Sequence, residues 1–144
     1  MSVFIDTSAL YALLDRDDAN HRPAAEAWAS LLESGEALST SNYVVVETTA
    51  LVQHRLGMSA VASLTRELLP VVSVEWVSEA DHREAAAALL AAGRRQVSLV
   101  DAVSFVLMRR LGADLAFTFD PHFEGEGFRA VGPKRTAGAR RSAR

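Results

Sequence analysis

The stretch SVFIDTSALYALL spans residues 2–14 and indicates the fold class of the whole chain. Its first part, Ser2–Ile5, is a short apolar run that ends at Asp6. Alanine and leucine then recur at helical spacing through Leu14. This change of period predicts a strand that leads directly into a helix. Such a pair is the opening of a β–α–β unit, in which the next strand runs parallel to the first.

The same alternation continues along the chain. Hydrophobic patterns and breakers predict further strands at 37–40, 71–77, 115–119 and 128–131, and helices at about 23–35, 42–57, 58–69, 78–93 and 98–112. Pro70 stops one of these helices, and Ser78 and Ser98 open two others in capping-box-like pairs with Asp81 and Asp101. Strands separated by helices imply right-handed crossovers and a parallel sheet covered on both faces. We therefore expect an α/β class with three α/β/α layers and a central, mostly parallel sheet of four or five strands.

Composition excludes several kinds of site. The chain has 144 residues and a mass of 15.5 kDa, which suits one domain. It contains no cysteine, which excludes disulfides, thiolate zinc sites and a cysteine nucleophile. The longest apolar run, Ala85–Ala92, is far shorter than the roughly 20 residues that span a bilayer. Asp6 interrupts the first hydrophobic segment, so no secretory signal is recognised. We expect a cytoplasmic protein without membrane contact.

Charge divides the chain into two parts. Residues 133–144 hold 5 of the 15 basic residues and no acid, whereas residues 1–132 hold all 18 acidic residues. The net charge is therefore −8 before residue 133 and +5 after it. We predict a folded domain over residues 1–132 and a basic, disordered tail over residues 133–144.

Acidic residues fall where strands end and helices begin. Asp6 and Asp120 each follow a predicted strand, and Asp101 lies in the first turn of a predicted helix. In a parallel sheet these positions share one edge, where ligands bind. Glu47 lies five residues beyond Asn42, or about 7.5 Å along the next helix, which is close enough to face the same edge. Topology alone therefore predicts four converging carboxylates.

Each acid also has a structural interpretation. Asp6 and Asp120 would cap the helices that follow them, and Asp101 would reciprocate the cap of Ser98. Glu47 lies past the first turn among apolar residues, so it needs either a buried arginine or a bound cation. Four neighbouring carboxylates repel one another, and a divalent cation offsets that repulsion. Oxygen ligands without cysteine or paired histidines favour Mg²⁺ or Mn²⁺ over Zn²⁺.

Other polar residues surround the predicted site. His122 follows Asp120 by two residues, but a histidine at a helix start is more often structural, so we do not include it. Nearby hydroxyls are candidates to orient the acids; they are Ser8, Ser98, Ser104 and Thr118.

Read in order, four segments resemble the PIN-domain nucleases, and most closely the VapC-like toxins of bacterial toxin–antitoxin pairs. They are Val3–Leu10, the helix from Glu47, Leu99–Ala102 and Thr118–Phe123. The resemblance implies a PIN-like fold over residues 1–132 and a Mg²⁺-dependent (or Mn²⁺-dependent) endoribonuclease that acts as a toxin on RNA. It also implies a homodimer and inhibition by a cognate VapB-like antitoxin.

Carried over position by position, Asp6, Glu47, Asp101 and Asp120 match the acidic quartet of that family. The resemblance makes Asp6 and Asp101 the expected direct metal ligands. Two other functions stay open. An aspartyl phosphotransferase would want a lysine near the phosphate, but the only lysine is Lys134 in the tail. A catalytically silent PIN-fold module would bind RNA or a partner without cleaving RNA.

Overall fold

The computed structural model describes residues 2–131. The five strands form one sheet in the order β3-β2-β1-β4-β5, and every neighbouring pair is parallel. The strands are β1 (Ser2–Ile5), β2 (Ala37–Ser41), β3 (Ser73–Glu75), β4 (Leu115–Phe117) and β5 (Arg129–Val131). The basic tail predicted for residues 133–144 lies outside the described residues. The sheet confirms the prediction of a parallel α/β fold.

Helices connect all of these strands. They are α1 (Thr7–Leu14), α2 (His21–Ser34), α3 (Asn42–Leu56), α4 (Met58–Ser63), α5 (Glu79–Ala92), α6 (Leu99–Leu111) and α7 (His122–Gly125), with short turns η1 (Leu64–Leu68) and η2 (Leu69–Val71). Within residues 2–131, none of the helices has the length and apolar character needed to cross a bilayer.

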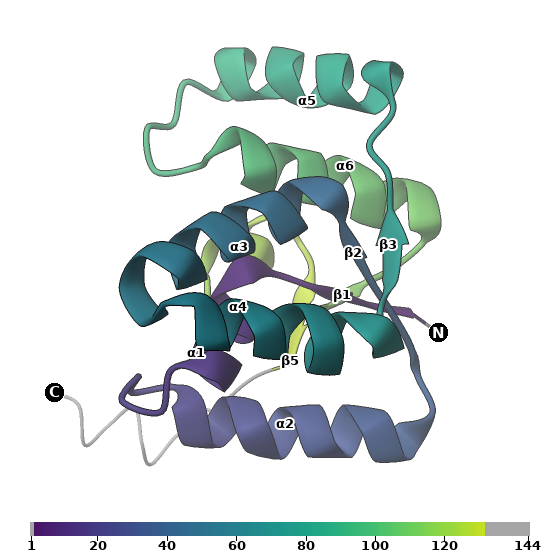
Figure 1. Ribbon diagram of the computed structural model, residues 1–144. Helices are drawn as coiled ribbons and strands as arrows, with labels where there is room; N and C mark the ends of the chain where they lie inside the picture. The colour runs from purple at the N-terminus through teal and green to yellow at the C-terminus, as the bar shows by residue number, and fades with distance from the viewer. Residues whose placement is uncertain (1, 132–144) are drawn as a thin grey trace, which may run out of the picture.

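The helices form two layers around the sheet. Strands β2 and β3 lie on one side of β1, and β4 and β5 lie on the other. Right-handed crossovers in opposite directions place α1 and α3 on one face and α5 and α6 on the other. In agreement, α1 contacts α2 and α3, and α5 packs along α6. Figure 1 shows α5 and α6 above the strands and α2 below them. The three-layer α/β/α prediction is therefore confirmed.

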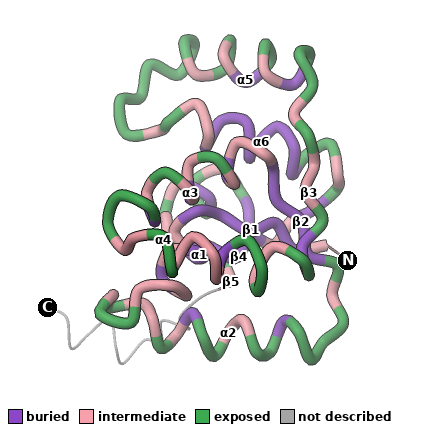
Figure 2. The backbone as a smooth tube through the Cα atoms, viewed as in Figure 1, coloured by how far each residue is buried: buried purple, intermediate pink, exposed green. Residues whose placement is uncertain are grey.

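The core lies on both faces of the central strands. Residues Val3–Ile5 are completely buried, as expected for a parallel strand covered on both faces. Phe117 of β4 stacks on Trp28 of α2, with 6.4 Å between ring centroids. On the other face, Phe105 of α6 meets Phe123 of α7 edge to face, with centroids 5.0 Å apart. Figure 2 shows this burial concentrated in the central strands and α6, while much of α2 and α5 is exposed.

The prediction of one helix over residues 58–69 is only partly correct. The α-helix ends at Ser63, and the chain continues through a π-helical turn, η1, and a 3₁₀ turn, η2. In η1 the backbone N–H of Leu69 donates to the carbonyl of Leu64, five residues earlier. Pro70 lacks an N–H and its ring would clash with the carbonyl four residues before it, so regular α-geometry cannot continue through it.

Two predicted strands are longer than the observed ones. The strand expected at 71–77 pairs only over Ser73–Glu75, where it meets the last three residues of β2 at the edge of the sheet. The strand expected at 115–119 ends at Phe117. The backbone N–H of Phe119 donates to the hydroxyl of Ser8 instead of to a strand (2.9 Å). The end of β4 is thus diverted into the site described next.

Candidate metal centre

The carboxyl ends of β1 and β4 bring Asp6 and Thr118 together. In the register of these strands Ile5 is opposite Phe117, so the next residue of each chain leaves the sheet at the same edge. The backbone N–H of Asp6 donates to the carbonyl of Phe117 (3.1 Å). Because both strands are buried and parallel, this edge is a fixed platform for the residues that follow.

Two hydroxyls hold one oxygen of the Asp6 carboxylate. Ser8 Oγ and Thr118 Oγ1 donate to Asp6 Oδ2 over 2.8 Å and 3.0 Å. The backbone N–H of Ser8 also points to this oxygen (3.4 Å), so Asp6 caps α1 as its structural interpretation predicted. Thr118 Oγ1 in turn accepts the backbone N–H of Asp120 (2.9 Å). The hydroxyls of Ser8 and Thr118 therefore orient Asp6, and Thr118 links it to Asp120.

The capping box of α6 fixes Asp101. Ser98 Oγ accepts the backbone N–H of Asp101, and Asp101 Oδ2 accepts the backbone N–H of Ser98, both over 3.1 Å. The box occupies one carboxylate oxygen only, so capping and ligand binding are compatible at this residue. Ser104 was also a candidate to orient an acid, but its hydroxyl donates to the carbonyl of Val100 (2.9 Å).

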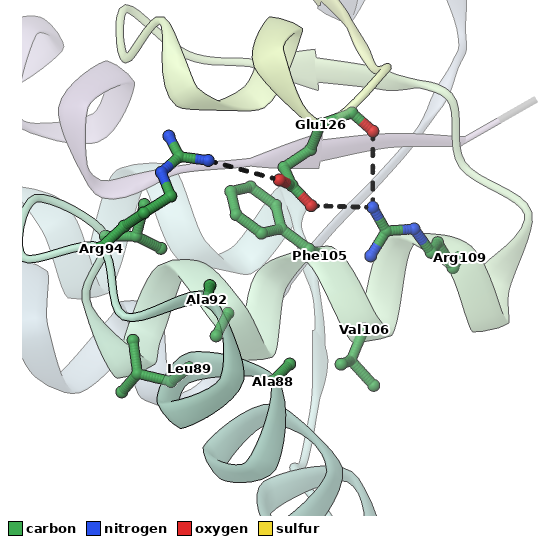
Figure 3. Close-up of a pocket in the computed structure, with 10 residues that line it drawn as sticks. Ala88, Leu89, Ala92, Arg94, Phe105, Val106, Arg109 and Glu126 are labelled. Carbon is green, nitrogen blue, oxygen red and sulfur yellow. Dashed lines mark hydrogen bonds and ion pairs between the residues drawn. The ribbon is translucent and has the colours of Figure 1, made fainter.

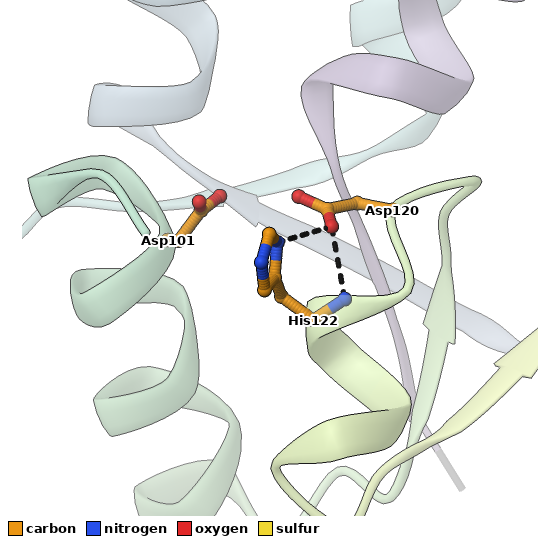
Figure 4. Close-up of side chains that lie close together, drawn as sticks. All are labelled: Asp101, Asp120 and His122. Carbon is orange, nitrogen blue, oxygen red and sulfur yellow. Dashed lines mark hydrogen bonds and ion pairs between the residues drawn. The ribbon is translucent and has the colours of Figure 1, made fainter. Parts of the chain in front are cut away.

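Asp101, Asp120 and His122 converge on one point, as Figure 4 shows. One ligand atom from each lies within 4.8 Å of the other two, an arrangement able to hold a metal ion. Asp120 Oδ1 contacts both the backbone N of His122 (2.9 Å) and its ring Nδ1 (2.7 Å). Sequence reasoning omitted His122 from the site. The spacing Asp-Pro-His was the available signal, because the turn it forms folds the ring back onto Asp120.

Glu47 completes the acidic group from the other helical layer. Ser41 Oγ caps α3 by accepting the backbone N–H of Val44 (3.1 Å), and Glu47 follows in the second turn. Its side chain is half-buried, and its negative charge acts on Asp101. Within residues 2–131 Glu47 forms no ion pair or hydrogen bond, so the buried arginine considered above is not its partner there.

The electrostatics of the site disfavour its own negative charge. Burial raises the pKa of Asp6 to about 6, and the charges of Asp101 and Asp120 add to this against the hydrogen bonds from Ser8 and Thr118. Burial also raises the pKa of Asp101, with Asp120 and Glu47 contributing, while the bonds with Ser98 oppose the rise. Repulsion among these carboxylates thus adds to the cost of burying their charges.

The donor set fits a divalent cation. Among the described residues, no arginine or lysine forms an ion pair with any of the four acids. The available ligand atoms are carboxylate oxygens, which suit Mg²⁺ and Mn²⁺, and one imidazole, whose nitrogen suits transition metals. The roles of Asp6, Glu47, Asp101 and Asp120 in binding and catalysis, including Asp6 and Asp101 as direct ligands, stay predictions.

The absence of an ion pair or hydrogen bond at Glu47 within residues 2–131 leads to a first prediction. Glu47→Gln should weaken Mg²⁺ binding by about tenfold without unfolding the chain, because it removes one charge near the cation but keeps the shape of the side chain. Calorimetric titration measures the affinity, and thermal unfolding in EDTA checks the fold. Unchanged affinity would make Glu47 a structural residue. Glu33→Gln, at an exposed position of helix α2, is the matched control.

A separate pocket lies between α5, α6 and the end of α7 (Figure 3). At its rim Arg109 donates to Glu126 Oε1 (3.0 Å), and Arg94 approaches the other carboxylate oxygen (3.8 Å). The remaining lining is mostly apolar and contains none of the four acids. These contacts tie the end of α7 to α6 and to the loop before α6, and so hold the short helix that begins with His122.

Comparisons with known proteins agree with this geometry. The family model described as PIN domain matches residues 3–125. The 23S rRNA-specific endonuclease VapC20 of Mycobacterium tuberculosis is 38% identical over 133 residues, which are 92% of this chain and 99% of that protein. Ribonuclease VapC26 of the same species is 31% identical over 122 residues, 82% of this chain and 86% of that protein.

Comparison with solved structures also finds proteins with the same fold. The crystal structure of M. tuberculosis VapC20, described as a Sarcin-Ricin loop cleaving toxin, has a TM-score of 0.81 and 38% identity, and the match covers 91% of this chain and 99% of that one. FitAcB from Neisseria gonorrhoeae has a TM-score of 0.65 and 16% identity, covering 94% of this chain and 100% of that one. The second likeness supports the fold alone.

Proposed function

Because the chain belongs to the PIN-domain family, we propose that it is the toxin of a toxin–antitoxin pair and a divalent-metal-dependent endoribonuclease. The observation that carries the proposal is the gathering of Asp6, Glu47, Asp101 and Asp120 at one sheet edge without an arginine or lysine partner among residues 2–131. Such a group suits a hard cation, which can activate a water and stabilise the charge that develops on a phosphodiester during hydrolysis.

In the proposed mechanism Asp101 and Asp120 hold the cation, and Asp6 contributes the carboxylate oxygen that Ser8 and Thr118 leave open. When bound there, Mg²⁺ or Mn²⁺ would supply an activated water and would offset charge that develops on the phosphate. Glu47 adds negative charge from α3, in the other helical layer, and so strengthens cation binding. The hydroxyls keep Asp6 in one orientation, so that little reorganisation is needed during the reaction.

The substrate and partners follow from the relatives. The chain shares 38% identity with a 23S rRNA-specific endonuclease over nearly the full length of both proteins, so we propose ribosomal RNA as the first substrate to test. This target would place the protein in the cytoplasm. A VapB-like antitoxin is the proposed inhibitor, and a homodimer is the proposed assembly.

Two arginines of α6, Arg109 and Arg110, are already engaged in ion pairs. Arg110 pairs with Asp81, and Arg109 pairs with Glu126. Arg95 is exposed and has no ion pair within residues 2–131, and it lies in the loop that leads into the helix of Asp101. We propose Arg95 as a phosphate contact beside the acidic site.

The proposed activity is tested with purified protein and ribosomal RNA. Cleavage is expected with added Mg²⁺ or Mn²⁺, is expected to stop in EDTA, and should return when excess Mg²⁺ is added. Sequencing the new RNA ends identifies the cut site. Equal cleavage in EDTA would refute the metal-dependent mechanism, and no cleavage of any RNA with either ion would favour a silent binding module.

A further inference from the structure

We propose that His122 is a protein ligand of the same cation as Asp101 and Asp120, and that its imidazole nitrogen makes the site prefer Mn²⁺ to Mg²⁺. The inference rests on the proposed function, because it requires a cation at the acidic group. It adds a residue outside the acidic quartet and a preference between two ions that the four carboxylates alone leave open.

The first support is geometric. Ligand atoms of Asp101, Asp120 and His122 all lie within 4.8 Å of one another. Two ligands of one ion are separated by at most about 4.4 Å when each bond is about 2.2 Å long, so small side-chain rotations close the site around an ion. Figure 4 shows the imidazole ring directed toward the space between the two carboxylates.

The second support is the hydrogen bonding of the imidazole. Nδ1 of His122 lies 2.7 Å from Asp120 Oδ1. Adjacent ligands of one ion lie about 3 Å apart when each bond is about 2.2 Å long. Nδ1 and Asp120 Oδ1 are therefore already close enough to bind the same cation, which would take the place of the proton between them.

The third support is the anchoring of the helix that carries His122. Helix α7 is only four residues long, and Glu126 follows it directly. Arg109 donates to both the side chain and the backbone carbonyl of Glu126 (3.0 Å and 3.4 Å). Phe123, next to His122, is fully buried. Both ends of the short helix are therefore fixed, and the imidazole is held in place before a cation binds.

The expected consequence is ion selectivity. Mg²⁺ prefers six oxygen ligands, whereas imidazole nitrogen suits transition metals. A site with two carboxylates and one imidazole therefore binds Mn²⁺ more tightly relative to Mg²⁺ than an all-carboxylate site does. Removing only the nitrogen ligand should lower the Mn²⁺ affinity strongly and the Mg²⁺ affinity weakly.

His122→Asn tests this directly. The side-chain amide of asparagine can still donate to Asp120, while the variant has no imidazole nitrogen that could bind the cation. We expect the dissociation constant for Mn²⁺ to rise about tenfold or more and that for Mg²⁺ to change by less than about threefold, as measured by calorimetry. Pulsed EPR of the Mn²⁺-loaded wild-type protein should show hyperfine coupling to a directly bound nitrogen, and the variant should lack it.

His54→Asn is the matched control, because His54 is exposed in the last turn of α3. It should retain the wild-type affinities and the nitrogen coupling. If the wild type binds Mn²⁺ without nitrogen coupling, or His122→Asn keeps the wild-type ratio of affinities, His122 only orients Asp120 and the inference fails while the proposed function stands. If the wild type binds neither ion, both fail.

Discussion

Asp101→Asn is expected to reduce RNA cleavage on the order of 1,000-fold while the fold is retained. The substitution removes the negative charge that would face the cation. The asparagine oxygen still accepts the backbone N–H of Ser98. The other half of the capping box does not change, because the backbone N–H of residue 101 donates to Ser98 Oγ. The loss is therefore chemical rather than structural. Initial rates on ribosomal RNA measure it, and circular dichroism checks the fold.

Asp81→Asn is the matched control for this variant. Asp81 occupies the same position relative to the cap of Ser78 in α5 as Asp101 does relative to Ser98 in α6, and both are buried. Its carboxylate pairs with Arg110 (2.9 Å) and is not one of the four acids of the candidate metal centre. We expect a small loss of stability and nearly unchanged cleavage. If Asp101→Asn cleaves RNA at more than about a tenth of the wild-type rate, Asp101 is not a metal ligand.

Asp6→Asn should abolish cleavage and, in EDTA, make the protein more stable at neutral pH. The pKa of Asp6 is raised to about 6, chiefly by burial, so the folded state disfavours the ionised carboxylate. Asparagine has no charge, can accept the bonds from Ser8 and Thr118, and is as good a helix cap as aspartate. The expected gain at pH 7.5 is about 3 kcal/mol in the free energy of unfolding.

The pH dependence gives this prediction its sign. A carboxyl whose pKa is higher in the folded than in the unfolded state favours folding when protonated. The wild type should therefore lose stability as the pH rises from about 4 through about 6, relative to Asp6→Asn. Urea denaturation in EDTA at pH 4.5 and 7.5 measures the difference. An advantage for Asp6→Asn that is absent at pH 7.5, or equal at both pH values, would contradict the burial argument.

Most of the fold could be predicted because local signals agree with the tertiary structure. Ser2–Ile5, the Ser98 capping box and the glycines after the helices are local features, and the elements lie close to the predicted ranges. The parallel topology then follows from the alternation of strands and helices. The same topology predicted that Asp6, Asp101 and Asp120 share one edge, because it requires only the order of elements.

The features that escaped prediction depend on contacts between distant segments. Asp81 looked like a second capping-box partner, but its side chain pairs with Arg110, 29 residues away. The predicted strand beyond Phe117 is interrupted because Ser8, from the first helix, accepts the N–H of Phe119. The direction of the His122 ring depends on a turn and on the anchoring of α7. None of these pairings is specified by local periodicity.

The central claim is that the carboxyl edge of the sheet holds a divalent cation between Asp101 and Asp120. A crystal structure of the wild-type protein soaked in Mn²⁺, with diffraction data collected at the manganese absorption edge, tests it most directly. The account predicts an anomalous difference peak in contact with these two carboxylates. A well-ordered site without such a peak, or manganese bound only elsewhere on the protein, would contradict it.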